Sequence, residues 1–178
     1  MKKTLAILAA LVMVFAAVAA LAEEPAAPVF AGGVQFDMDM EQVMELVNLP
    51  NPEIESAKFR GTTEFYELEY EDIVTDDGFV ADINYLFVGN GLVAIHFDLA
   101  DGTSYEALKA QLTAIYGEAV PFNASKIGNG RFVIDDDGDL KDCREMIEAN
   151  GVIFVLEQDR DGDVDVTILD PTAAYINN

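Results

Sequence analysis

Three consecutive segments alternate between apolar and polar residues with a period of two: 64–74, 79–88 and 92–99. Asp76-Asp77-Gly78 separates the first pair, and Gly89-Asn90-Gly91 separates the second. A period of two is typical of β-strands that cover a core with one face, and glycine-rich breaks of this kind form tight turns. The pattern therefore predicts an antiparallel meander with one apolar face and one acid-rich face.

Two segments that flank the meander repeat apolar residues at helical spacing. The first begins at Asp39, with Gln42 at the capping-box distance, and ends at the prolines that follow. The second runs from Tyr105 and ends at Gly117, and Thr103 is its expected N-cap. We expect this second helix to cover the apolar face of the meander.

The C-terminal half shows weaker patterns. We expect a loop over 118–130, a short strand over 131–134, a helix over 139–150, and two strands over 152–157 and 164–169. The order of all these elements predicts one two-layer α+β domain. Its helices would pack on one face of a mostly antiparallel sheet of about five to six strands.

Residues 1–22 have the pattern of a secretory signal peptide. Two lysines precede an apolar run, and Ala20 and Ala22 occupy the positions that a signal peptidase reads. We expect cleavage after Ala22 and a secreted or periplasmic protein. The run is also about long enough to span a bilayer, so an uncleaved anchor is the alternative.

The remaining chain divides into a Pro/Ala/Gly-rich linker over 23–33, a single domain over 34–170 and a tail over 171–178. The residue directly after the expected cleavage site is Glu23 rather than cysteine, so we expect no lipid anchor. The single Cys143 cannot form an internal disulfide, and the fold must therefore depend on its core.

Acidic residues dominate the charge of the chain. Its 178 residues include 33 Asp and Glu but only 10 Lys and Arg, which gives a net charge of −23. Two of the lysines lie in the expected leader, so the exported chain would carry −25. Such a charge repels nucleic acid and anionic lipid, and we expect neither as a partner.

Two aspartate clusters, 135–139 and 159–165, contain the D-x-D-G-D core of calcium loops. The second provides the calcium candidates Asp159, Asp161, Asp163 and Asp165. The twelfth position is Ile168 in the second loop and Arg144 in the first, and neither can coordinate calcium, so neither cluster is a complete EF-hand. We favour a hairpin turn at Asp161-Gly162 and a helix cap at Asp139. Weak calcium binding at extracellular concentrations is the alternative.

The residues of the sequence give little support for a catalytic site. His96 is the only histidine, and a zinc site would need more nitrogen and sulfur ligands than His96 and Cys143 supply. A Cys143–His96 dyad is formally possible, but Cys143 lies on an apolar stripe where cysteine usually packs as a small hydrophobe. The nucleophile elbow and the phosphate-binding and dinucleotide-binding glycine patterns are missing. We expect no catalytic residue and no cofactor.

Three stretches, Phe36–Val43, Val88–Ile95 and Tyr105–Gly117, resemble many uncharacterised exported bacterial proteins. Their architecture is similar to β-lactamase-inhibitor-like modules and to the small SmpA/OmlA-type lipoproteins of outer-membrane assembly. The resemblance covers about residues 34–118 and implies a binding or scaffold module with no catalytic residue to carry over. Ala22-Glu23 replaces the junction with cysteine that the lipoprotein members have, so a membrane anchor is not implied.

These observations favour a secreted, non-catalytic module that binds a protein partner through the exposed face of its sheet. A calcium-binding extracellular module is the alternative, followed by a hydrolase, and the oligomeric state is left open. The expected docking face combines acidic and apolar side chains, namely Glu67, Glu69, Glu71, Asp82 and Asp98 with Phe65, Ile73 and Leu86.

Overall fold

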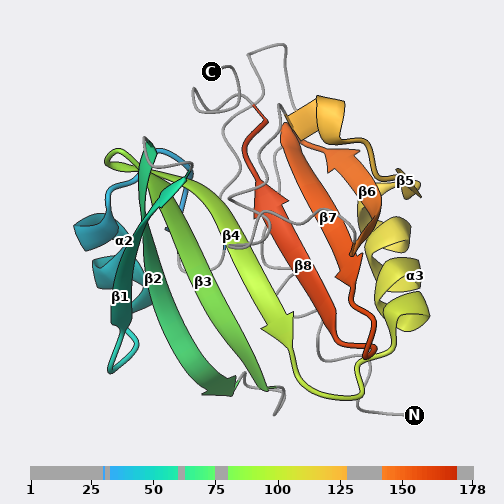
Figure 1. The fold of residues 1–178 in the computed structure, drawn as a ribbon, viewed down its shortest axis with the longest axis horizontal. Coiled ribbons are helices and arrows are strands. Elements are labelled where there is room, and N and C mark those ends of the chain that lie inside the picture. Colours follow the sequence, from blue (N-terminus) through green and yellow to red (C-terminus); the bar gives the residue numbers. More distant parts are fainter. Residues whose placement is uncertain (1–29, 31–32, 60–62, 75–79, 128–141, 172–178) are drawn as a thin grey trace.

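A computed structural model describes residues 30, 33–59, 63–74, 80–127 and 142–171. In this part of the chain, eight strands form one antiparallel sheet in the order β1-β2-β3-β4-β8-β7-β6-β5 (Figure 1). The strands are β1 Glu53–Phe59, β2 Thr63–Val74, β3 Val80–Val88, β4 Gly91–Leu99, β5 Val120–Pro121, β6 Cys143–Ala149, β7 Val152–Gln158 and β8 Val164–Leu169. The helices are α2 Met40–Val47, α3 Tyr105–Tyr116 and the 3-10 helix η2 Ala124–Ile127.

The expected fold class is wrong. The chain is not a two-layer α+β domain with five to six strands, because the described residues form mostly one eight-stranded antiparallel sheet with two short α-helices. Strand β1 has no counterpart among the expected elements. The helix expected over 139–150 is, in its described part, strand β6.

The β6–β7 hairpin explains that error. Asn150 and Gly151 have φ angles of 51° and 82°, the left-handed pair that a tight hairpin turn requires, whereas a glycine directly after the expected helix would also suit a helix end. A register shift between Cys143 and Glu145 also breaks the alternation of β6. The apolar residues of β6 consequently fall at a spacing that also suits a helix.

Replacing Asn150 with alanine tests this turn. Alanine at the end of a helix is neutral or favourable, whereas at a φ of 51° it adopts a left-handed conformation that costs about 1 kcal/mol. We therefore expect Asn150→Ala to lower the free energy of unfolding by about that amount, measured by urea denaturation. An unchanged or increased stability would contradict the hairpin.

The loop expected over 118–130 contains the short strand β5 and the 3-10 helix η2, whereas most other elements agree with the sequence patterns. The three meander strands, the two C-terminal strands and both α-helices are confirmed to within a few residues. Asp39 caps α2 in a complete capping box with Gln42. The N-cap of α3 is Ser104 rather than Thr103. The signal peptide, the strand expected over 131–134 and the aspartate cluster at 135–139 lie outside the described residues.

The larger hydrophobic cluster joins both α-helices to one face of the sheet. Figure 1 shows α2 at the β1 end of the sheet and α3 at the β6 end. Val43 of α2 and Leu112 of α3 are fully buried in this cluster, and the ring of Tyr116 stacks on Phe154 with centroids 4.5 Å apart. Phe30, which the sequence assigns to the linker, is only 5 % exposed and packs here too.

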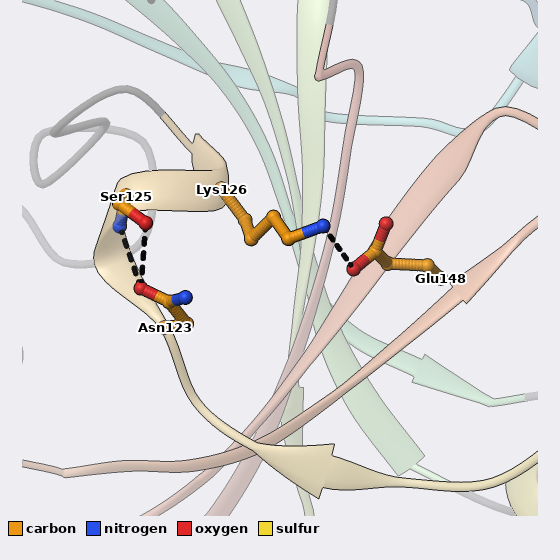
Figure 2. A network of polar contacts seen from close by, with 4 residues as sticks. All are labelled: Asn123, Ser125, Lys126 and Glu148. Carbon is orange, nitrogen blue, oxygen red and sulfur yellow. Dashed lines mark hydrogen bonds and ion pairs between the residues drawn. The ribbon is translucent and has the colours of Figure 1, made fainter.

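A smaller cluster occupies part of the opposite face. It includes Met146 and Val155 of the sheet, and Ile127 of η2 packs against them. Figure 2 shows an ion pair between η2 and β6, in which Lys126 Nζ lies 3.2 Å from Glu148 Oε1. The rest of this face carries polar and acidic residues, which form the candidate site.

Candidate functional site

Four carboxylates lie side by side across the sheet. Asp82, Asp98, Asp165 and Glu157 are successive cross-strand partners on β3, β4, β8 and β7, and we call them the acid row. Side chains directly opposite one another in an antiparallel sheet have Cβ atoms about 5 Å apart, so like charges there destabilise the fold. The acid row therefore costs stability unless protons or cations neutralise part of it.

A proton shared by Asp98 and Asp165 relieves part of this repulsion. The pKa of Asp165 is raised to about 7, chiefly by burial and then by the charge of Asp98 and the hydrogen bond between the two carboxyls. Burial also raises the pKa of Asp98, and the charge of Asp82 adds to this, whereas the hydrogen bond with Asp165 lowers it. That bond therefore favours the protonated form of Asp165 beside the charged form of Asp98.

The carboxylates continue toward the β1 edge. Burial raises the pKa of Glu69, and the charges of Glu71, Asp82, Glu53 and Glu55 add to the effect. By register and alternation, Glu53, Glu55 and Glu69 lie on the same face as three residues of the acid row, namely Asp82, Asp98 and Asp165. We call the following set the acid face: Glu53, Glu55, Glu69, Asp82, Asp98 and Asp165.

Two lysines form ion pairs away from the acid face. Lys109 Nζ lies 2.7 Å from Glu145, and Lys126 binds Glu148, both at the β6 side of the sheet. Among the side chains that the structure describes, no lysine or arginine forms an ion pair with a carboxylate of the acid face. Among the described side chains, the acid face therefore carries one sign of charge.

A buried hydrogen-bond chain borders the acid face. Thr167 Oγ1 donates to Glu157 Oε1 over 2.8 Å, and His96 Nδ1 lies 2.9 Å from the same hydroxyl oxygen. Because a hydroxyl carries one hydrogen, and Glu157 receives it, His96 must donate through Nδ1. Glu157 is 5 % exposed and Thr167 is fully buried. The chain therefore supplies a buried carboxylate with the donor that it needs.

This arrangement differs from a nucleophilic site. A hydroxyl nucleophile donates its hydrogen to the imidazole, whereas here the Thr167 hydrogen points to Glu157. Cys143 Sγ lies 3.8 Å from Glu157 Oε2, on the far side from His96. His96 on β4 and Cys143 on β6 are separated by β8 and β7, so about 14 Å of sheet lies between them. The two do not form a dyad in this geometry.

Removing the Thr167 hydroxyl tests the buried chain. Thr167→Val keeps the shape of the side chain but takes a donor from a carboxylate that is 5 % exposed, so we expect a loss of about 2 kcal/mol. Urea denaturation measures the loss, and Thr113→Val on α3 is the control. A loss for Thr167→Val no larger than that of the control would show that Glu157 does not depend on this bond.

The calcium candidates do not converge. Asp159 Oδ1 accepts from the backbone N–H groups of Asp161, Gly162 and Asp163 at 2.7–2.9 Å, which is the hairpin turn that we favoured. Asp165 belongs to the acid row instead. The described part of the chain contains no group of three or more His, Cys, Asp or Glu side chains that could hold a metal ion. Calcium binding stays a prediction.

The prediction that apolar side chains are exposed on the docking face is wrong. Phe65 and Leu86 are 6 % and 7 % exposed because the smaller cluster buries them, and Ile73 packs against the larger cluster. The acids Glu71 and Asp98 are exposed, and the others expected there are half-buried. Asp165 also lies on this face, which the strand patterns did not predict, although Asp163, Asp165 and Thr167 alternate with valines.

The chain has no match among protein-family models, curated proteins or solved structures. The resemblance to the β-lactamase-inhibitor-like and SmpA/OmlA-type modules therefore stays a prediction. Among the residues that the structure describes, no helix has the length and apolarity needed to cross a bilayer.

Proposed function

We propose that this protein is an exported, non-catalytic module that binds a cationic surface of a partner protein through its acid face. One observation supports the proposal: six carboxylates gather on five adjacent strands, with no ion pair to lysine or arginine within the described residues. Export is inferred only from the pattern of residues 1–22.

Repulsion within the acid face supports this assignment. Cross-strand carboxylates lower the stability of a sheet, and proteins tend to break such local rules at functional sites. Arginine or lysine side chains from a partner would lie between the carboxylates and remove the repulsion. They would also replace the proton that Asp98 and Asp165 share, because a nearby cation favours the charged form of both.

The proposal can be tested by titrating the purified protein with a deca-arginine peptide at neutral pH, using fluorescence anisotropy. We expect saturable binding that weakens steeply with added salt. The double variant Asp98→Asn/Asp165→Asn should bind about tenfold more weakly, since each lost ion pair is worth a fraction of a kcal/mol up to about 1 kcal/mol. This variant removes two formal charges from the face.

A matched control separates a local site from net charge. Glu106→Gln/Glu118→Gln removes the same number of charges from exposed positions on α3 and just beyond it. We expect this variant to bind almost as tightly as the unchanged protein. Equal losses for the two double variants would mean that overall charge, and not the acid face, attracts the peptide, and would overturn the proposal.

Calcium binding by the 159–165 loop is a separate prediction with its own test. If it occurs, millimolar calcium should raise the melting temperature, and Asp161→Asn should abolish the rise. If the melting temperature does not change, the calcium alternative fails and the proposal for the acid face is unaffected.

A further inference from the structure

Strand β1 is an edge of the sheet in the described part of the chain. It pairs with β2 over seven residues, from Glu53↔Glu69 to Phe59↔Thr63, and no described strand pairs with its other side. Figure 1 shows β1 at the end of the sheet opposite β5 and β6. An edge strand presents unpaired backbone N–H and C=O groups, to which another extended chain can add.

The side chains at this edge alternate in chemistry. Glu53 and Glu55 are exposed on the acid face, whereas Ile54 points to the other face and is 54 % exposed. Ile54 is the most exposed of the large hydrophobic residues that the structure describes. A chain that adds beside β1 would place one set of alternate side chains near the two glutamates and the other set near Ile54.

A second copy of this protein fits the edge poorly. If two β1 strands joined with their acid faces on the same side, they would bring glutamates from both copies together. If one copy were turned over, Ile54 of each would face the carboxylates of the other. Acidic residues on an edge thus hinder self-pairing, but they favour a strand of opposite charge.

We infer that the β1 edge captures an extended cationic segment of a partner protein, which adds to the sheet as a further strand with basic and apolar residues in alternation. The inference rests on the proposed function only for the sign of the partner's charge. Main-chain hydrogen bonds supply affinity in such complexes, and the alternating side chains supply selectivity. Glu53 and Glu55 would bind the basic residues, and Ile54 would pack against the apolar ones.

A synthetic peptide of alternating arginine and valine, as long as the seven residues of β1, is a suitable probe. Two further peptides carry N-methyl groups, one on all arginine amides and the other on all valine amides. Only alternate N–H groups of an added strand point toward the sheet, so one methylated peptide should bind at least about tenfold more weakly than the other. Fluorescence anisotropy measures all three.

Protein variants give an independent readout. Glu53→Gln/Glu55→Gln should weaken the parent peptide several-fold, whereas Glu41→Gln/Glu45→Gln on the exposed side of α2 should change little. If both methylated peptides bind like the parent, or if the parent does not bind, the inference is overturned. If all three peptides bind alike and only Asp98→Asn/Asp165→Asn weakens them, strand addition is overturned and the proposed function still holds. A failure of deca-arginine to bind would overturn the proposed function itself.

Discussion

Replacing Phe154 with alanine will destabilise the fold by about 4 kcal/mol. Phe154 lies in the middle of β7, is fully buried, and stacks on Tyr116 of α3. Its loss leaves a cavity between the sheet and the helix and removes the ring contact that fixes α3 there. Because domains of this size are stable by only about 5–15 kcal/mol, the change removes a large share of the total.

Urea denaturation of the purified protein measures this effect. Ile115→Ala on α3 is the control, because Ile115 is 41 % exposed and its truncation removes fewer contacts. We expect the control to cost less than about 1 kcal/mol. Similar losses for the two variants would show that α3 does not pack on β7 as described.

Replacing Asp165 with asparagine will stabilise the protein above neutral pH. The pKa of Asp165 is raised from 3.8 to about 7, so the folded state holds a proton that the unfolded state releases at lower pH. The stability that this proton gives to the unchanged protein is fully present below about pH 4, falls as pH rises toward 7, and is lost above pH 7. Asparagine keeps a hydrogen-bond donor for Asp98 and carries no charge.

The pKa of Asp165 sets an upper limit on this gain in stability. A rise to about 7 corresponds to about 4 kcal/mol for a fully buried group, and since Asp165 is partly open to water, we expect about a third of that. Thermal unfolding followed from acid to alkaline pH should show the two proteins converging near pH 4. The control Glu118→Gln should show no such trend. A gain of equal size at all pH values would contradict the shared proton.

The local pattern of the sequence predicted most of the strands and both α-helices. The period-two segments from 64 to 99 depend on neighbours that are close in sequence, and so do the caps at Asp39 and Gly117. The Asn150-Gly151 turn carried an equally local signal, but the irregular spacing in β6 concealed it. Errors of this kind arise where a register shift disturbs the alternation.

Local sequence patterns could not predict the acid row, for a different reason. Alternation shows which residues share a face of one strand, but not which strand lies beside which. Asp98 and Asp165 are 67 residues apart in the sequence and are brought together because β8 pairs with β4. Leu86 is likewise buried in a cluster with residues that are distant in the sequence, among them Ile127 of η2. Strand order therefore decides both the charge and the exposure of this face.

Proton release on binding tests the central claim most directly. The heat of binding deca-arginine near pH 7, measured by calorimetry in two buffers of different ionisation enthalpy, gives the number of protons exchanged. If a cationic partner occupies the acid face, about half a proton should leave for each peptide bound, because Asp165 with a pKa of about 7 is about half protonated there. Asp165→Asn should abolish the release. Binding without proton release, and with unchanged affinity in this variant, would contradict the account.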